Sequence, residues 1–209
     1  MTGAQRSVRA AATGADGAVH GPVHQLGPEW VAGPDGVGFR QAARVILLDG
    51  ADRVLLLHGC DVDQRERSWW FTVGGGIETG EAPRDAAVRE LFEETGITLD
   101  PRALVGPVWR RSAVFDFFRE SCRQEEVFFL GRYDGQAGAD PAAVDGADGA
   151  SGFSRDGWTQ VEVDTIDELR WWDLDALAAL DEEVFPARLA DLVRAVLGGW
   201  GGVIRDLDD

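Results

Sequence analysis

The sequence contains no lysine, so arginine supplies all 20 basic residues against 37 acidic ones. A formal net charge of −17 leaves no broad basic surface for displacing the counterions of DNA or RNA, or for binding an anionic membrane. The imbalance is strongest over residues 134–209, which hold 18 acidic residues and 5 arginines. We therefore expect a small-molecule substrate rather than a nucleic-acid polymer or a membrane partner.

Cysteine is also scarce, because Cys60 and Cys122 are the only two and lack the paired spacing of zinc or redox sites. No apolar run reaches the roughly 18 residues that a membrane-spanning helix needs. The N-terminal residues lack the apolar stretch of a signal peptide. These absences favour reduced thiols and a cytoplasmic location.

Hydrophobic patterning divides the chain into three parts. Residues 1–37 lack periodicity and are rich in glycine and alanine, which predicts a flexible N-terminal tail. Residues 38–198 carry the β-like and helical patterns of one domain, interrupted by a low-complexity loop of Gly, Ala, Asp and Ser at 134–157. Residues 199–209 are expected to form an acidic, frayed C-terminal tail.

Within the domain, apolar and β-branched runs predict strands, and capping residues predict helices. Strands are expected at 42–48, 53–57, 68–73, 105–109, 113–118, 126–133 and 168–172. The first two, joined by a turn at 49–52, are expected to form a hairpin buried on both faces. Helices are expected from Pro83 to a cap at Gly96, over 174–180 and over 186–197. This order predicts an α/β fold.

The first of these helices carries three glutamates at helical spacing. Glu90, Glu93 and Glu94 stand at i, i+3 and i+4, which places three carboxylates on one face, expected to line a cleft. Their mutual repulsion lowers helix stability unless a cation compensates it, and hard oxygen ligands favour Mg²⁺ or Mn²⁺. The residues expected to pack on the sheet are Val88, Leu91, Phe92 and Thr95.

Two neighbouring features support this interpretation. Residues 74–76 are three glycines that end a strand, and glycine lets the backbone approach a ligand or ion closely. Arg89 can hold a carboxylate with two parallel hydrogen bonds, so we interpret it as an orienting residue.

The segment from Gly75 to Ile97 resembles the Nudix box at all nine of its specified positions, spacing included. These positions are Gly75, Glu81, Arg89, Glu90, Leu91, Glu93, Glu94, Gly96 and Ile97. The resemblance implies an α/β/α sandwich with a mixed β-sheet, in which the box forms a loop–helix–loop. It also implies metal-dependent hydrolysis of a diphosphate linkage in a nucleoside di- or triphosphate derivative, and a homodimer is common in the family.

Carried over by position, the resemblance implies roles for individual residues. Glu90, Glu93 and Glu94 would bind the metal, the Gly74 carbonyl would offer a further ligand, and Glu81 would support the cluster or bind through water. Glu93, Glu90 and Arg89 would serve catalysis. The general base stays open among Glu93, Glu125 and Glu126.

The substrate is not identified by the sequence. Arg110 and Arg111 could bind substrate phosphate, Glu126 could contact substrate, and an aromatic residue could stack on a base. Markers of the ADP-ribose, diadenosine polyphosphate and coenzyme A subfamilies are absent. Two other functions on the same fold are weighed: a ligand-binding module without turnover, and a prenyl diphosphate isomerase. The isomerase needs a catalytic cysteine in a setting that Cys60 does not resemble.

Overall fold

The computed structural model describes residues 30–32, 37–61, 64–117, 120–135 and 157–208. Most of the expected N-terminal tail and residues 136–156 of the expected low-complexity loop lie outside these ranges. None of the helices in the described ranges combines the length and apolar character that crossing a membrane requires.

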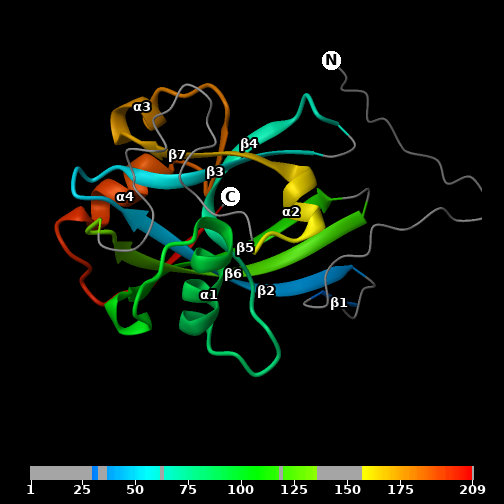
Figure 1. The fold of residues 1–209 in the computed structure, drawn as a ribbon, viewed down its shortest axis with the longest axis horizontal. Helices are drawn as coiled ribbons and strands as arrows, with labels where there is room; N and C mark the ends of the chain where they lie inside the picture. Colours follow the sequence, from blue (N-terminus) through cyan, green and yellow to red (C-terminus); the bar gives the residue numbers. More distant parts are fainter. Residues whose placement is uncertain (1–29, 33–36, 62–63, 118–119, 136–156, 209) are drawn as a thin grey trace, which may run out of the picture.

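Nine strands of the described chain form one mixed sheet (Figure 1). The strand order is β7-β3-β4-β2-β6-β5-β9, with β1 paired to β2 and β8 to β4. The pairs β2–β6, β4–β8 and β5–β9 are parallel, and the other pairs are antiparallel. The strands are β1 (Val31–Ala32), β2 (Gly38–Leu48), β3 (Val54–Cys60), β4 (Ser68–Gly76), β5 (Val105–Phe117), β6 (Glu120–Arg132), β7 (Ile166–Trp172), β8 (Glu183–Phe185) and β9 (Arg205–Leu207).

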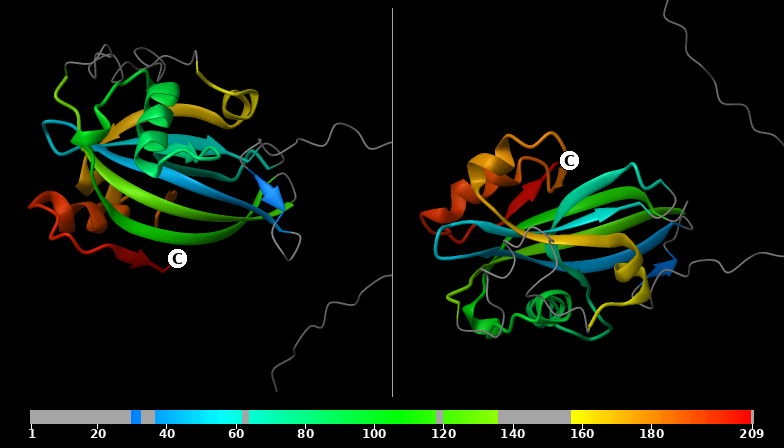
Figure 2. Two further views of the ribbon diagram at one scale, coloured as in Figure 1. Left: turned by 90° about the horizontal axis from the view of Figure 1, so that it is seen from below. Right: turned by 45° about the horizontal axis from the view of Figure 1, so that its top comes forward.

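Helices cover both faces of the sheet and complete the expected α/β/α sandwich (Figure 2). One face carries α1 (Pro83–Thr95) and α2 (Gln160–Thr165), and the other carries α3 (Leu174–Ala178) and α4 (Leu189–Leu197). A short 3₁₀ helix, η1 (Pro101–Ala103), follows α1. Side chains of β2 alternate between two hydrophobic clusters, one on each face of the sheet. Val45 packs in the cluster that includes Ala87 and Leu91 of α1 (the α1 cluster). Ile46 packs in the cluster that includes Leu174 of α3 and Val193 of α4 (the α3/α4 cluster). The sheet is therefore buried on both faces here, as its continuous apolar runs predicted.

The predicted hairpin of β2 and β3 exists only beside its turn, where Leu48 pairs with Val54. Further along, β4 lies between the two strands and pairs with both. Its pairing with β2 runs from Val73 to Gly76, which places the glycine end of β4 beside the middle of the sheet. The site described below is built around this end.

Two predicted strands prove to be one, because β5 runs without a break from Val105 to Phe117. The polar residues 110–112, which suggested a break, pair in register with residues 125–127 of β6. In the segment expected to be a frayed tail, β9 pairs in parallel with β5, and Leu207 packs against the α3/α4 cluster. Helix α4 begins at Leu189 rather than at residue 186, because Arg188 at its N-cap adopts a left-handed conformation with φ 57°.

Candidate metal centre

Helix α1 forms where its end signals predict it. Pro83 occupies its first turn, and Gly96 ends it in the left-handed region with φ 74°, where its N–H donates to the Phe92 carbonyl. The expected packing face was wrong in one respect, because the Phe92 side chain is 56% exposed. The buried face consists of Ala86, Ala87, Glu90, Leu91, Glu94 and Thr95. Two of the glutamates thus lie between the helix and the sheet rather than along an open cleft wall.

Two glycines at the end of β4 make room for these carboxylates. A Cβ atom at Gly75 would lie 2.6 Å from a carboxylate oxygen of Glu90. Gly74 has φ 129°, and a Cβ there would lie 2.2 Å from the Ala43 carbonyl oxygen. The Gly74 N–H donates to Glu94 Oε2 at 2.7 Å. Gly74 therefore requires glycine, because the backbone of β2 occupies the place of a side chain there. A side chain at Gly75 would displace the Glu90 carboxylate.

A third carboxylate joins the two from α1. Oxygens of Glu90, Glu94 and Glu162 lie within 4.8 Å of one another. Glu162 belongs to α2, far along the chain, and sequence reasoning missed it. The local sequence signal here indicates only a helix start, since Thr159 and Glu162 form a reciprocal capping box in which the Glu162 carboxylate accepts from Thr159.

The segment before α2 is anchored on the C-terminal end of α1. The Trp158 indole N–H donates to the Glu94 carbonyl oxygen at 3.0 Å. This carbonyl is among the last four of the helix, which have no partner within it. At Gly157 a Cβ would lie 2.7 Å from the Glu93 carbonyl oxygen, so this backbone runs directly against α1. The anchor brings Glu162 to the α1 glutamates.

The electrostatics of the cluster call for a cation. Burial raises the pKa of Glu90 to about 7, although the adjacent Arg89 opposes the rise. Burial also raises the pKa of Glu94 well above its usual range, and the charge of Glu90 raises it further. Two buried carboxylates and a half-buried third, brought this close together, suit a hard divalent cation such as Mg²⁺ or Mn²⁺, which prefers oxygen ligands.

Arg89 organises the remaining acids of the box. Its Nε and Nη2 donate to the two carboxylate oxygens of Glu81, both at 2.9 Å. Its Nη1 donates to Glu90 at 2.8 Å and to Glu93 at 3.0 Å, and Nη2 also donates to the Gly76 carbonyl at 2.8 Å. The hydrogen bond from Arg89 lowers the pKa of Glu81. Glu93, 41% exposed, therefore lies beside Arg89 and outside the three-carboxylate group.

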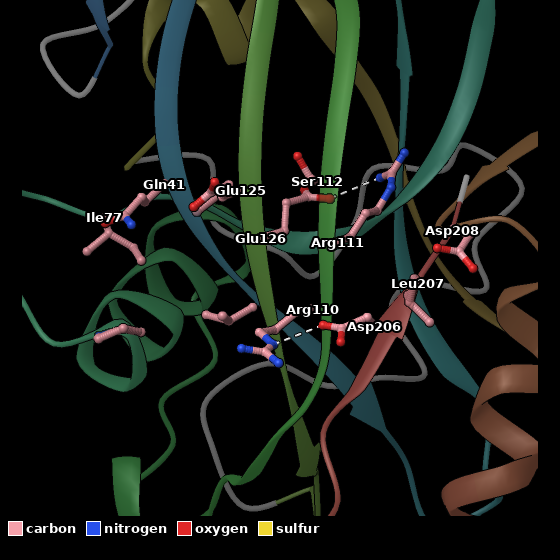
Figure 3. A pocket seen from close by; sticks show the side chains of 13 residues that line it. Gln41, Ile77, Arg110, Arg111, Ser112, Glu125, Glu126, Asp206, Leu207 and Asp208 are labelled. Atoms are coloured by element: carbon pink, nitrogen blue, oxygen red, sulfur yellow. Dashed lines mark hydrogen bonds and ion pairs between the residues drawn. The ribbon is translucent and has the colours of Figure 1, made fainter. Parts of the chain in front are cut away.

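A pocket of about 560 Å³ lies next to the loop between β4 and α1, which we call the box loop (Figure 3). Residues of β2, β6, β5 and β9 line the rest of it. Arg110 borders it and pairs with Asp206 at 3.1 Å, and both side chains are largely exposed. Exposed Glu125 lines the same pocket.

Arg111 and Glu126, which the sequence placed at the substrate, also border this pocket but are already engaged. Their charged groups pair at 3.0 Å, and the two side chains are only 11% and 3% exposed. Glu126 also accepts from Arg44 at 2.9 Å. The buried ion pairs leave these two residues little capacity for a ligand.

The Gly74 carbonyl, expected to bind metal, accepts from Arg44 Nη1 at 2.6 Å. A carbonyl oxygen has two lone pairs, so one stays available for a further partner. The two cysteines are both buried, Cys60 on β3 and Cys122 on β6.

Comparison with known proteins shows which family the domain around this site resembles. The family model described as NUDIX domain matches residues 38–193. An RNA pyrophosphohydrolase of Dinoroseobacter shibae is 37% identical over 101 residues, which cover 47% of this chain and 58% of that protein. A putative 8-oxo-dGTP diphosphatase of Bacillus subtilis is 34% identical over 102 residues, covering 49% of this chain and 60% of that protein. The chain thus spans little more than half the length of these curated relatives.

Among solved structures, a MutT protein from Methanosarcina mazei aligns with a TM-score of 0.47 and 18% identity. The alignment covers 75% of this chain and 91% of that one.

Proposed function

Because this chain belongs to the Nudix family, we propose that it hydrolyses a diphosphate linkage in a nucleoside di- or triphosphate derivative, with Mg²⁺ or Mn²⁺ as cofactor. The observation that carries the proposal is the convergence of Glu90, Glu94 and Glu162 against the glycine end of β4. Repulsion among two buried carboxylates and a half-buried third is costly unless a cation compensates it.

Glu90, Glu94 and Glu162 are the proposed metal ligands, and the free lone pair of the Gly74 carbonyl can add a fourth oxygen. Glu81 supports them through Arg89, and Glu93 extends the negative surface toward solvent, where it can reach a second ion. A bound divalent cation at such a site lowers the pKa of water and offsets the charge of phosphate oxygens.

The remaining residues of the box orient and accept protons. Arg89 fixes the carboxylates of Glu81, Glu90 and Glu93 at once and so keeps the cluster in one geometry. Glu93 and Glu125 are the candidates for the general base, because both are exposed on the box side of the sheet. Glu126 is the weaker candidate for that role, since its carboxylate is 3% exposed and paired with two arginines.

The pocket beside the box loop is the proposed place for the nucleoside. Ile77 and Pro83 border it from the segment of the box that leads into α1, so a ligand seated there lies beside the box. Arg110 is the proposed phosphate contact, because its pairing with Asp206 is exposed and such pairs contribute about 1 kcal/mol or less. The acidic surroundings, which include Glu125, favour a single nucleotide over a long polyanion.

Chromatographic detection of the products over a broad panel tests this proposal, because cleavage of a diphosphate linkage releases pyrophosphate or phosphate monoesters. The panel includes nucleoside triphosphates, 8-oxo-dGTP, nucleotide sugars, an RNA with a 5′ triphosphate and a prenyl diphosphate, each with Mg²⁺, Mn²⁺ or EDTA. We expect metal-dependent release from at least one small nucleotide. Binding without release from any member would favour the ligand-binding module, and conversion of a prenyl diphosphate without phosphate release would favour the isomerase.

Glu162→Gln tests the ligand that lies outside the box. We expect at least tenfold lower turnover and a higher Mn²⁺ requirement, because one of three carboxylate ligands is lost. Glu66→Gln, which neutralises an exposed carboxylate in the loop between β3 and β4, is the control. Equal activity of Glu162→Gln and the control would remove Glu162 from the metal site. We also propose a cytoplasmic location and a homodimer, and light scattering measures the oligomeric state.

A further inference from the structure

Arg44 is a buried arginine in the middle of β2, and the box does not include it. Its neighbours Ala43 and Val45 pack in the α1 cluster, so alternation along the strand directs Arg44 toward the opposite face of the sheet. The residue is only 9% exposed. A guanidinium so deeply buried requires a full set of acceptors.

Those acceptors connect β6 to the end of β4. Arg44 Nε donates to Glu126 Oε1 at 2.9 Å. Its Nη1 donates to the carbonyl oxygens of Thr72 at 3.1 Å and Gly74 at 2.6 Å. Glu126 is itself fixed, since the Gln124 amide donates to Oε1 at 2.6 Å and Arg111 to Oε2 at 3.0 Å.

Gly74 is therefore held from both sides. Its carbonyl accepts from Arg44, while its N–H donates to Glu94 Oε2 at 2.7 Å. With φ 129° it departs from regular strand geometry and has no side chain to fix it. The direction of its N–H, and with it the position of the Glu94 carboxylate, depends on the partner of its carbonyl.

We propose that Arg44 and Glu126 are positioning residues of the metal site: Glu126 fixes Arg44, Arg44 fixes the Gly74 backbone, and Gly74 fixes Glu94. The inference rests on the proposed metal dependence. Charge supports it, because Arg44 and Arg111 together hold the pKa of Glu126 below its usual range although burial alone would raise it. Glu126 thus stays ionised and keeps Arg44 in place at neutral pH.

Mn²⁺ binding without substrate, measured by calorimetry and by electron paramagnetic resonance of the free ion, tests the proposal. Arg44→Lys keeps the charge, but an ammonium group cannot reproduce the planar contacts to one carboxylate and two carbonyls. We expect its Mn²⁺ affinity to fall at least tenfold, the usual range for losing a residue that orients a ligand. Arg84→Lys is the matched control, because Arg84 also holds backbone carbonyls, those of Pro101, Leu104 and Gly106, away from the cluster.

Glu126→Gln is the second variant, since glutamine retains the shape and one acceptor oxygen for Arg44 but removes the charge that pairs with it. We expect a smaller loss of Mn²⁺ affinity, about threefold, with thermal stability close to that of Arg84→Lys. Unchanged Mn²⁺ affinity in a folded Arg44→Lys or Glu126→Gln protein would overturn the positioning role. Equal losses in Arg44→Lys and Arg84→Lys would reduce it to general stability. Absence of Mn²⁺ binding by the wild type would instead remove the proposed function.

Discussion

Replacing Glu90 by glutamine should stabilise the metal-free protein at pH 8 while it removes metal binding. The carboxyl group is 7% exposed and faces Glu94 and Glu162. Burial raises its pKa from 4.5 to about 7, a net effect that already includes the favourable contact with Arg89. A tenfold change in proton affinity corresponds to about 1.4 kcal/mol, so ionised Glu90 disfavours the folded state by about 3 kcal/mol.

The sign of this effect follows from proton binding. Between pH 4.5 and about 7 the folded protein retains a proton on Glu90 that the unfolded chain has released. The free energy of unfolding of the metal-free wild type therefore falls as pH rises through this window and stays low above it. Glutamine carries no charge at any of these pH values, so the variant lacks this dependence. For a chain of this size, about 3 kcal/mol corresponds to a melting temperature higher by roughly 6–12 °C.

Thermal unfolding in EDTA at pH 5, 6, 7 and 8 measures this difference, with Glu66→Gln as the exposed control. Titration with Mn²⁺ at pH 8 should reverse the order, because the wild type binds the ion in its folded state and the variant binds it poorly. A Glu90→Gln protein that melts at or below the wild-type temperature in EDTA at pH 8 would refute the claim that the cluster is self-repelling.

Two further substitutions test the packing around the cluster. Gly75→Ala places a Cβ 2.6 Å from a Glu90 carboxylate oxygen, so Mn²⁺ affinity should fall at least tenfold in calorimetry, whereas Gly50→Ala, with no atom within 4 Å, should leave it unchanged. Trp158→Phe loses an indole hydrogen bond to the end of α1 and should lower the free energy of unfolding by about 1 kcal/mol and weaken Mn²⁺ binding. Trp200→Phe loses an exposed bond of the same kind, and a matching loss of Mn²⁺ affinity there would contradict the anchoring role of Trp158.

The box helix could be predicted to the residue because its determinants are local. Pro83 and Gly96 mark its ends by their own backbone preferences, whatever surrounds them. The order of the strands could not be predicted from the sequence, because strand pairing depends on contacts between segments that are distant in the chain. The turn between β2 and β3 is a true hairpin signal, yet β4 enters between these strands and pairs with both. Likewise, polar residues 110–112 interrupt an apolar pattern without interrupting the strand.

The same distinction between local and long-range determinants applies to the candidate site. Spacing indicated that Glu90, Glu93 and Glu94 share one side of a helix. It does not indicate which of the three carboxylates is buried against the sheet and which is exposed. The position of the helix on the sheet decides it, placing Glu90 and Glu94 inside and Glu93 beside Arg89. Glu162 required the fold of α2 against α1, which no local pattern within the box encodes.

The absence of lysine is a property of the whole chain, yet at two positions the structure itself requires arginine. All five N–H donors of a guanidinium are in use at Arg89, which contacts three carboxylates and a carbonyl. Arg44 contacts a carboxylate and two carbonyls on the other face of the sheet. Arg89 therefore contacts the carboxylate cluster directly through Glu90, and Arg44 contacts it indirectly through Gly74. A protein with a net charge of −17 can assemble such a site because the local field depends on these two residues, while the remaining acidic excess is spread over solvated surface.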